Sequence, residues 1–420
     1  MLEDYRYDAK GCVRCSDCKW IDPMYMKSSR FSKICPINAR YFFDSYSAQG
    51  LMDIALGVID GKLRFTPKLL DALYRCTLCG ACDIMCKRCL DLEVLDVIHE
   101  LRIKSVQDGR GPMPEHMEMA KRVEENHNVY GEAHDERMAW MPEHVKQDEK
   151  ADTVYFVGCA SAYRNQEIAL ATSKILEAGG VGFKIIDERC CGGPVYKTGQ
   201  TGLAKKLMEH NVEAIERAGA SRVVTSCAEC YHMLKIDYPR LTGRDRMDFD
   251  VIHITELMDG LVKDGKLRFR SGPSVKVTYH DPCYLGRLGE PYVHWRGKRK
   301  KFGRLTKPKE FRRGTHGVYD PPRNVLRSIP GVEIVEMERI RENTWCSGGS
   351  YELKVAFDDF ALWTAKERVE EACSTEADAI VTCCPFAKTN LKEAAEKMNR
   401  RIPVYDVTEM VAKSIEAEAR

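Results

Sequence analysis

Cys190-Cys191-Gly192-Gly193 recurs, with one substitution, as Cys346-Ser347-Gly348-Gly349 in this chain of 420 residues. Around both copies, from residue 151 onward, short β-branched runs alternate with amphipathic helical patterns, which predicts layers of helices on sheets. The expected strands are 154–157, 181–186, 222–225, 275–279, 332–335 and 379–382. The pattern therefore predicts two α/β units related by duplication, unit 1 over residues 151–270 and unit 2 over residues 271–420.

Cysteines follow several of the predicted strands directly. They are Cys159 and Cys227 in unit 1, and Cys283 and Cys384 in unit 2. In an open α/β sheet the carboxyl end of the strands is where ligands bind. An odd total of 19 cysteines, in a chain without a secretion signal, fits metal ligation better than a disulfide framework. We therefore expect the cysteines of both units to be candidate metal ligands.

The cysteine sets of the two units are unequal. Aligned on their glycine pairs, unit 1 has Cys191 where unit 2 has Ser347, and Cys230 where unit 2 has Ala387. A serine hydroxyl is a poor iron ligand beside a thiolate, and alanine cannot ligate at all. Unit 2 is therefore expected to be a degenerate, mainly structural half. Its remaining candidate ligands are Cys283, Cys346, Cys383 and Cys384. Cys383 is expected to point away from its neighbour, because successive residues near a strand end face opposite sides.

Two cysteine triplets of the form C-x2-C-x2-C precede these units, and each is followed by a further cysteine. In two-cluster ferredoxins that fourth cysteine ligates the cluster of the other triplet. The predicted ligand sets are Cys12, Cys15, Cys18 and Cys86 for one cubane 4Fe-4S cluster, and Cys76, Cys79, Cys82 and Cys35 for the other. Cys89 is left over as a structural thiol. A pair of zinc sites is the alternative, because C-x2-C also suits tetrahedral zinc.

Between the triplets, residues 41–72 carry helix-like apolar spacing. Residues 1–110 are therefore predicted to form a helical ferredoxin-like domain rather than a compact βαβ ferredoxin. Residues 111–150 contain no cysteine and include prolines at 112, 114 and 142, so we expect an exposed helical linker there. The predicted fold class is thus α+β and multidomain, with the helical domain ahead of the two α/β units.

Composition excludes several classes of function. A net charge of +2 gives no global sign of nucleic-acid binding or of attraction to an anionic membrane. No run approaches the roughly 18 apolar residues of a membrane span, and the acidic start lacks the order of a signal peptide. We therefore expect a non-exported, cytoplasmic protein without a direct membrane span.

One local segment departs from this charge balance. Between Arg296 and Arg313, within a predicted insertion at 294–316, ten basic residues stand against one acidic residue, Glu310. Such a run is typical of a solvated loop, and a docking surface for an acidic partner protein is the sharper interpretation. Nucleic acid comes third, because no recognition motif accompanies the segment.

The pattern C-x30-C-C-x35-C-x2-C of unit 1, partly repeated in unit 2, resembles the cysteine-rich CCG domain. A two-cluster ferredoxin module ahead of two such units resembles the D subunit of heterodisulfide reductase. Several short peptides are also similar to the heterodisulfide-reductase-like iron–sulfur subunit of the class II benzoyl-CoA reductase complex. They lie at residues 30–36, 280–287, 319–331 and 335–339.

The resemblance implies one noncubane 4Fe-4S cluster in unit 1. Its ligands would be Cys159, Cys190, Cys191, Cys227 and Cys230. In some relatives a CCG unit holds zinc instead, and a disulfide or an empty site is the remaining alternative. Heterodisulfide reductase uses two noncubane clusters side by side, whereas this chain is expected to build one at most.

Three functions are compatible with these motifs. The first is an electron-transfer subunit of a multisubunit anaerobic oxidoreductase, fed by or feeding a flavoprotein, with a benzoyl-CoA reductase as the host that the resemblance suggests. The second is a thiol–disulfide reductase, and the third is a zinc-stabilised assembly scaffold. The sequence contains no nucleotide-binding motif. His280 and Asp281, beside Cys283, are expected to form hydrogen bonds or caps rather than to donate protons, so no catalytic residue is assigned.

Overall fold

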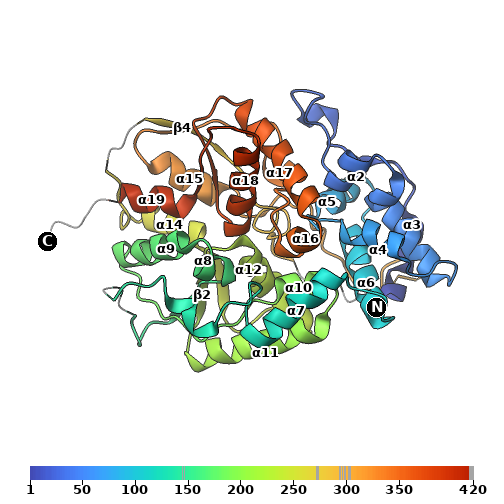
Figure 1. The fold of residues 1–420 in the computed structure, drawn as a ribbon, viewed down its shortest axis with the longest axis horizontal. Coiled ribbons are helices and arrows are strands. Elements are labelled where there is room, and N and C mark those ends of the chain that lie inside the picture. The colour runs from blue at the N-terminus through green and yellow to red at the C-terminus, as the bar shows by residue number, and fades with distance from the viewer. Residues whose placement is uncertain are drawn as a thin grey trace.

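The computed structural model describes residues 1–143, 145, 147–270, 274–292, 295, 297, 299–300 and 304–415. Figure 1 shows the N-terminal helices, in blue, at one end of the molecule, with unit 1 in green and unit 2 in orange and red packed side by side beyond them. The predicted fold class, a helical domain followed by two α/β units, is confirmed. Among the described residues, no helix is long and apolar enough to cross a membrane.

The N-terminal domain is built from short helices joined by the cysteine loops. They are α1 (Arg6–Gly11), α2 (Pro36–Tyr41), α3 (Ala48–Ile59), α4 (Pro67–Tyr74), α5 (Ala81–Cys89) and α6 (Val94–Gln107). Local caps fix where they begin: the Ser47 hydroxyl accepts from the Gly50 N–H ahead of α3, and Thr66 caps α4, with Pro67 in its first turn. Fully buried Leu51, Leu73 and Leu101 join α3, α4 and α6 in one core.

The segment expected to be an exposed linker instead packs against both units. Its helix α7 (Pro114–Asn126) buries Met119 and Val123 completely in the core that the two units share. The spacing of four residues places both side chains on one face of the helix, so that face is covered while the charged face is exposed. The helical part of the expectation holds, and the exposure does not.

Unit 1 contains a parallel three-stranded sheet in the order β1-β2-β3. The strands are β1 (Thr153–Phe156), β2 (Arg222–Thr225) and β3 (Asp250–His253). The helices are α8 (Cys159–Tyr163), α9 (Gln166–Ala178), α10 (Gly193–Lys197), α11 (Thr201–Arg217), α12 (Ala228–His232), α13 (Tyr238–Thr242) and α14 (Ile254–Lys263), with a π-helical turn, η6 (Met233–Asp237), between α12 and α13. The strand expected at 181–186 is absent from these described residues, where Lys184 makes only an isolated bridge to Val154.

Unit 2 repeats this plan with a fourth strand, in the order β5-β4-β6-β7. The strands are β4 (Val275–Tyr279), β5 (Val332–Ile334), β6 (Ala379–Thr382) and β7 (Val404–Asp406). The helices are α15 (Asp320–Ser328), α16 (Tyr351–Ala356), α17 (Asp358–Cys373), α18 (Pro385–Lys397) and α19 (Val407–Ser414). In both units the last strand leads directly into a helix that begins with a capping box. The box is formed by His253 and Glu256 in unit 1 and by Asp406 and Glu409 in unit 2.

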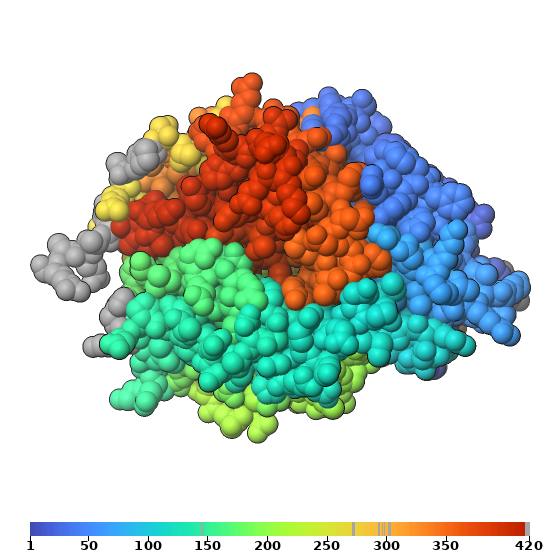
Figure 2. Space-filling view, viewed as in Figure 1, coloured from blue at the N-terminus to red at the C-terminus, as the bar shows by residue number. Residues whose placement is uncertain are grey.

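One hydrophobic core extends through both units. It includes the buried strand residues Phe156 and Val224 of unit 1 together with Val277 and Val381 of unit 2. Figure 2 shows the two units in contact along their length, with the N-terminal domain covering one end of both. The two sheets therefore hold fixed positions relative to each other.

The basic segment folds back onto the N-terminal domain of the same chain. The Lys309 ammonium is buried and lies 3.0 Å from an Asp91 carboxylate oxygen, with Glu93 as a second ionic partner. Arg312, also buried, lies 3.5 Å from Asp83. The expectation of a solvated loop is therefore wrong for these two residues, because their acidic partners come from residues far away in the sequence. Residues 293, 294, 296, 298 and 301–303 of this region lie outside the described residues.

We expect Lys309→Met to destabilise the protein by about 3 kcal/mol, because it removes a buried cation that two carboxylates share and leaves Glu93 with Lys87 alone and Asp91 with Arg299 alone. Lys307→Met is the matched control, since Lys307 is exposed in the same segment and should change stability by about 0.5 kcal/mol or less. Anaerobic urea unfolding, followed by circular dichroism, measures both. Equal effects of the two substitutions would contradict a clamping role for Lys309.

Candidate metal centres

The first cysteine triplet and Cys86 surround one cavity. The structure brings Cys12, Cys15, Cys18 and Cys86 together there, with Ala48, Met52 and Val94 among the other lining side chains. Cys86 lies on α5, which begins in the second triplet. Cys86, the cysteine that follows the second triplet, therefore lies beside the first triplet. This is the crossed arrangement that the spacing predicts.

The second triplet and Cys35 surround a neighbouring cavity. Its lining includes Cys35, Cys76, Cys79 and Cys82, and Ala48 borders both cavities. Burial raises the pKa of the Cys35 and Cys82 thiols well above the usual value. These thiols are therefore protonated in the metal-free chain, so that binding a metal there must release protons.

Both triplets use the same backbone device. The residues two and four positions after the first cysteine have positive φ, at Arg14 (59°) and Ser16 (71°) in one triplet and at Leu78 (47°) and Gly80 (74°) in the other. Residues other than glycine seldom adopt this conformation, and such strain concentrates at functional sites. The repeated pattern turns each triplet into a loop that surrounds its cavity.

Two buried guanidinium groups hold the second triplet in place. Arg102, on α6, donates to the carbonyl oxygens of Leu73 (3.0 Å), Tyr74 (3.2 Å) and Cys76, and also to the Lys197 carbonyl of unit 1 at 3.0 Å. Arg287 of unit 2 donates to the Cys79 carbonyl at 2.8 Å. The second cavity therefore lies where all three parts of the chain meet.

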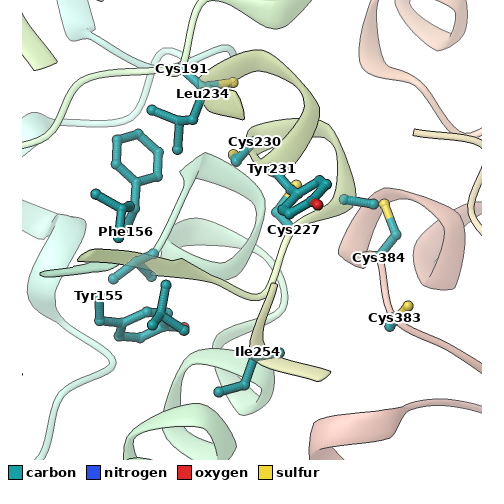
Figure 3. Close-up of a cluster of buried hydrophobic side chains, with 14 of the residues drawn as sticks. Tyr155, Phe156, Cys191, Cys227, Cys230, Tyr231, Leu234, Ile254, Cys383 and Cys384 are labelled. Carbon is teal, nitrogen blue, oxygen red and sulfur yellow. The ribbon is translucent and has the colours of Figure 1, made fainter. Parts of the chain in front are cut away.

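In unit 1 the five predicted ligands lie together at the carboxyl end of the sheet. Cys159 follows β1, Cys190 and Cys191 precede α10, and Cys227 and Cys230 lie before and within α12. Thiol–thiol contacts link Cys159 to Cys190, Cys190 to Cys191, Cys191 to Cys230, and Cys230 to Cys227. Figure 3 shows three of them, Cys191, Cys227 and Cys230, around the first turn of α12.

Gly158 is required by this close packing of sulfurs. It has φ +76°, and a Cβ atom built there would lie 2.9 Å from the Cys230 sulfur. The backbone N–H groups of Val157 and Gly158, just before Cys159, donate hydrogen bonds to the buried Glu188 carboxylate at 3.0 and 2.7 Å. Burial raises the pKa of Glu188 to about 7. Gly158 and Glu188 were not identified as site residues from the sequence. A glycine directly before the first cysteine of unit 1 could have indicated Gly158.

In unit 2 the structure brings three of the four candidate cysteines to one cavity. Cys283, Cys346 and Cys384 line it together with Ser347 and Ala387. Its empty volume, about 360 Å³, is close to the roughly 350 Å³ of each cavity in the N-terminal domain. The two substituted positions have therefore not closed the space.

Cys383 is the candidate that the structure excludes from this cavity. Its sulfur lies 2.8 Å from the Tyr279 hydroxyl at the end of β4, and Cys383 is not among the residues that line the cavity, whereas Cys384 is. Figure 3 shows Cys384 beside Cys227 of unit 1 and Cys383 farther away. The expected opposite orientation of these neighbours is therefore observed, and Cys383 is a buried structural thiol.

Contacts between cysteines also join the separate sets, which the spacing did not predict. Cys346 contacts Cys79 of the second triplet, and it also contacts Cys283 within its own unit. On the other side of the unit 2 cavity, Cys384 contacts Cys227 of unit 1. The cavity of unit 2 thus lies between the second triplet and the thiols of unit 1.

The remaining polar candidates have structural roles. The His280 ring accepts a hydrogen bond from Arg368 at 3.0 Å, and burial together with this cation lowers the pKa of His280. Asp281 accepts two hydrogen bonds from Arg323, at 2.7 and 2.8 Å. Within the described ranges, no group of three or more Cys, His, Asp or Glu side chains is arranged to hold a single metal ion.

Comparison with known proteins defines the class first. The family profile of the cysteine-rich domain CCG matches residues 153–235 and 310–392, one stretch in each unit. Among solved structures, a hypothetical protein from Helicobacter pylori aligns with a TM-score of only 0.47 at 9% identity, over 78% of this chain and 58% of that chain.

Relatives that match almost the whole chain then define the family. The D subunit of the dihydromethanophenazine:CoB–CoM heterodisulfide reductase of Methanosarcina acetivorans is 34% identical over 96% of this chain and 93% of its own length. The chain belongs to this family of iron–sulfur oxidoreductase proteins. More distant relatives include the B subunit of the fumarate reductase (CoM/CoB) of Methanothermobacter marburgensis, at 29% identity over 94% of this chain and 70% of that protein. Another is the EtfAB:quinone oxidoreductase of Syntrophomonas wolfei, at 26% identity over 99% of this chain and 60% of that protein.

We expect Gly158→Ala to release metal from unit 1, because the added methyl group collides with the Cys230 sulfur. Gly180→Ala is the matched control: its φ is also positive, at +65°, but nothing lies within 4 Å of the added atom. Both should lose about 1 kcal/mol of stability from backbone strain, and only Gly158→Ala should lose metal. Iron and zinc per chain, measured after anaerobic purification, give the answer. Unchanged metal in Gly158→Ala would mean that these thiols do not form a tight site.

Proposed function

We propose that this chain transfers electrons inside a multisubunit anaerobic oxidoreductase. Two cubane 4Fe-4S clusters would be held by the crossed cysteine sets of the N-terminal domain, and one noncubane 4Fe-4S cluster by the five thiols of unit 1. Zinc is the alternative occupant of unit 1. Membership of an iron–sulfur oxidoreductase family supports this assignment.

The proposal rests mainly on one observation: the thiols that remain in unit 2 contact the cysteine sets on either side of it. Cys346 contacts Cys79 of the second triplet, and Cys384 contacts Cys227 of unit 1. The two positions without a thiol, Ser347 and Ala387, make neither of these contacts. Unit 2 thus keeps one sulfur against each of the other two sets, on either side of the cavity through which an electron path from the N-terminal domain to unit 1 would pass.

The partner and the host complex follow from resemblance. The proposed partner is a flavoprotein, and the short peptides at 30–36, 280–287, 319–331 and 335–339 support a class II benzoyl-CoA reductase as the host. Iron–sulfur potentials depend on net charge, hydrogen bonds to sulfur and burial, so these contacts do not fix the direction of flow. A zinc-stabilised scaffold would instead be colourless after anaerobic purification.

The relay is tested by Cys346→Ala. The wild type should contain about 12 iron atoms per chain, or about 8 if zinc occupies unit 1, and Cys346→Ala should retain them while electrons reach unit 1 at least tenfold more slowly. Rapid-freeze electron paramagnetic resonance after mixing with a reduced flavoprotein follows both centres. Cys373→Ala, at a half-buried thiol outside the cavities, is the control and should transfer electrons at the wild-type rate.

Two results would contradict this proposal. Equal transfer rates in Cys346→Ala and in the wild type would exclude a path through this thiol. A wild-type content of about 16 iron atoms, falling in Cys346→Ala, would mean that unit 2 holds a cluster of its own.

Heterodisulfide reduction is the second candidate, because relatives at 33% and 34% identity carry that name. Reduced chain should nevertheless not turn over the CoB–CoM heterodisulfide, since Ser347 and Ala387 remove the second noncubane site that paired clusters need. Anaerobic oxidation of a reduced dye, with and without the disulfide, measures this. Disulfide-dependent turnover that disappears in Cys191→Ala would establish the reductase and reject the electron-transfer role.

A further inference from the structure

An exposed aromatic surface lies on the N-terminal domain. The side chains of Trp20, Phe42 and Phe43 belong to residues that are 43%, 74% and 70% exposed. The Lys33 ammonium lies 5.6 Å from the centre of the Trp20 ring and 4.2 Å from the centre of the Phe42 ring. Both distances allow a cation–π contact, so the lysine joins the two rings. We call Trp20, Lys33, Phe42 and Phe43 the aromatic patch.

The aromatic patch is attached to both cysteine sets of this domain. Trp20 comes two residues after Cys18, which lines the cavity of the first triplet. Lys33 comes two residues before Cys35, which lines the cavity of the second triplet. A backbone bridge between Trp20 and Lys33 holds the two segments side by side. A molecule that covers the patch would therefore lie close to both cavities.

Phe42 occupies a backbone position that favours glycine. It directly follows α2, with φ +58° and ψ 1°, in the left-handed region. Helices commonly end in this conformation at a glycine, because a side chain is strained there. An exposed ring gains little from burial to offset that strain. The stability of the domain therefore does not explain Phe42, and unfavourable backbone conformations of this kind concentrate at functional sites.

The charge on the patch favours an acidic partner. Lys33 makes no ion pair with a carboxylate of the described residues, whereas the nearby Lys19 lies 2.5 Å from Asp44. A cation held between two rings has little water around it, so a partner's carboxylate would be attracted strongly. The basic segment offers less, because its buried Lys309 and Arg312 already face carboxylates of this chain.

We propose that the aromatic patch is the docking surface for a partner protein with an apolar contact face that carries a carboxylate opposite Lys33. Exchange of electrons between this partner and the two cysteine sets rests on the proposed function, whereas docking itself does not. Figure 1 shows α2 remote from helices α9 and α11 of unit 1, so a partner at this end leaves the outer face of unit 1 uncovered.

Two other occupants fit the patch less well. In a two-fold contact between copies of this chain, the same surface of each copy meets its equivalent. Two Lys33 ammonium groups would then face each other without a carboxylate between them. An anionic membrane would be repelled by Asp17 and Asp22, which are both exposed and adjoin Trp20 in the sequence.

The test uses the full-length oxidised holoprotein and an oxidised flavodoxin of net negative charge, so that no electrons move. Isothermal titration calorimetry should show saturable one-to-one binding that weakens as salt is added. Phe42→Gly should weaken this binding about tenfold, because it removes an aromatic anchor. The same substitution should raise the urea concentration at the midpoint of unfolding, since glycine relieves the strain. A merely structural role for Phe42 would instead lower that midpoint.

Lys33→Met removes the charge and keeps an apolar chain, so it should weaken binding about three- to tenfold and flatten the salt dependence. Lys413→Met is the matched control, because the Lys413 ammonium also lies over a ring, 4.6 Å from the centre of Tyr405, but in unit 2. Phe311→Ala, at an exposed ring outside the patch, is the control for Phe42. Both controls should bind like the wild type, and iron content verifies that every variant holds its clusters.

Absence of saturable flavodoxin binding would overturn the inference, as would equal binding by the wild type, Phe42→Gly and Lys33→Met. Two results would assign the patch to another occupant and so overturn it as well. One is binding to vesicles of equal parts phosphatidylglycerol and phosphatidylcholine that Phe42→Gly abolishes, and the other is a wild-type dimer that Phe42→Gly dissociates. Because no electrons move in these assays, their failure leaves the proposed electron path untouched, and a failed relay test with Cys346→Ala leaves docking standing.

Discussion

The hydrogen bonds of two buried arginines to the second cysteine triplet determine how the rest of the molecule is arranged. Arg102 joins the carbonyl of Cys76 to that of Lys197 in unit 1, and Arg287 of unit 2 donates to the carbonyl of Cys79. Backbone carbonyls at such a junction would otherwise be buried without partners, which is costly. Because each guanidinium spans two parts of the chain, the triplet cannot shift without breaking contacts to both units. The contact between Cys79 and Cys346 depends on this fixation.

Sequence patterns predicted the strands whose own residues favour a buried strand. The strands that end before Cys159, Cys227 and Cys384 are continuous apolar or β-branched runs, as buried parallel strands are. β3 was missed because its four residues begin with Asp250 and end with His253, a composition that is unfavourable for strands. The run at 181–186 has the right composition, but only Lys184 reaches the sheet. Burial of α7 and of Lys309 could not be predicted, because both depend on partners far away in the sequence.

The same distinction between local and long-range causes applies to the candidate metal sites. The crossed fourth cysteines came from the pattern of two-cluster ferredoxins, and the five-thiol set of unit 1 came from the resemblance to the CCG domain. Spacing grouped only the cysteines within each triplet, since ligands within a few residues of one another must share a neighbourhood. It could not predict that Cys346 meets Cys79, or that Cys384 meets Cys227, because those contacts exist only after the three parts have packed together. The tertiary packing that hides these contacts from sequence reasoning also places the cavity of unit 2 between the second triplet and the thiols of unit 1.

Unit 2 also explains how a site can lose ligands and keep its shape. Gly348 and Gly349 remain although a full thiol set does not, because added Cβ atoms would lie 2.5 Å from the Ala361 carbonyl oxygen and 2.4 Å from that of Phe386. Both collisions are with backbone, which cannot move as a flexible side chain can. The loop that carries Cys346 is therefore held by packing against α17 and α18 rather than by a metal. Such a loop keeps Cys346 in contact with Cys79 of the second triplet, whether or not the cavity of unit 2 is filled.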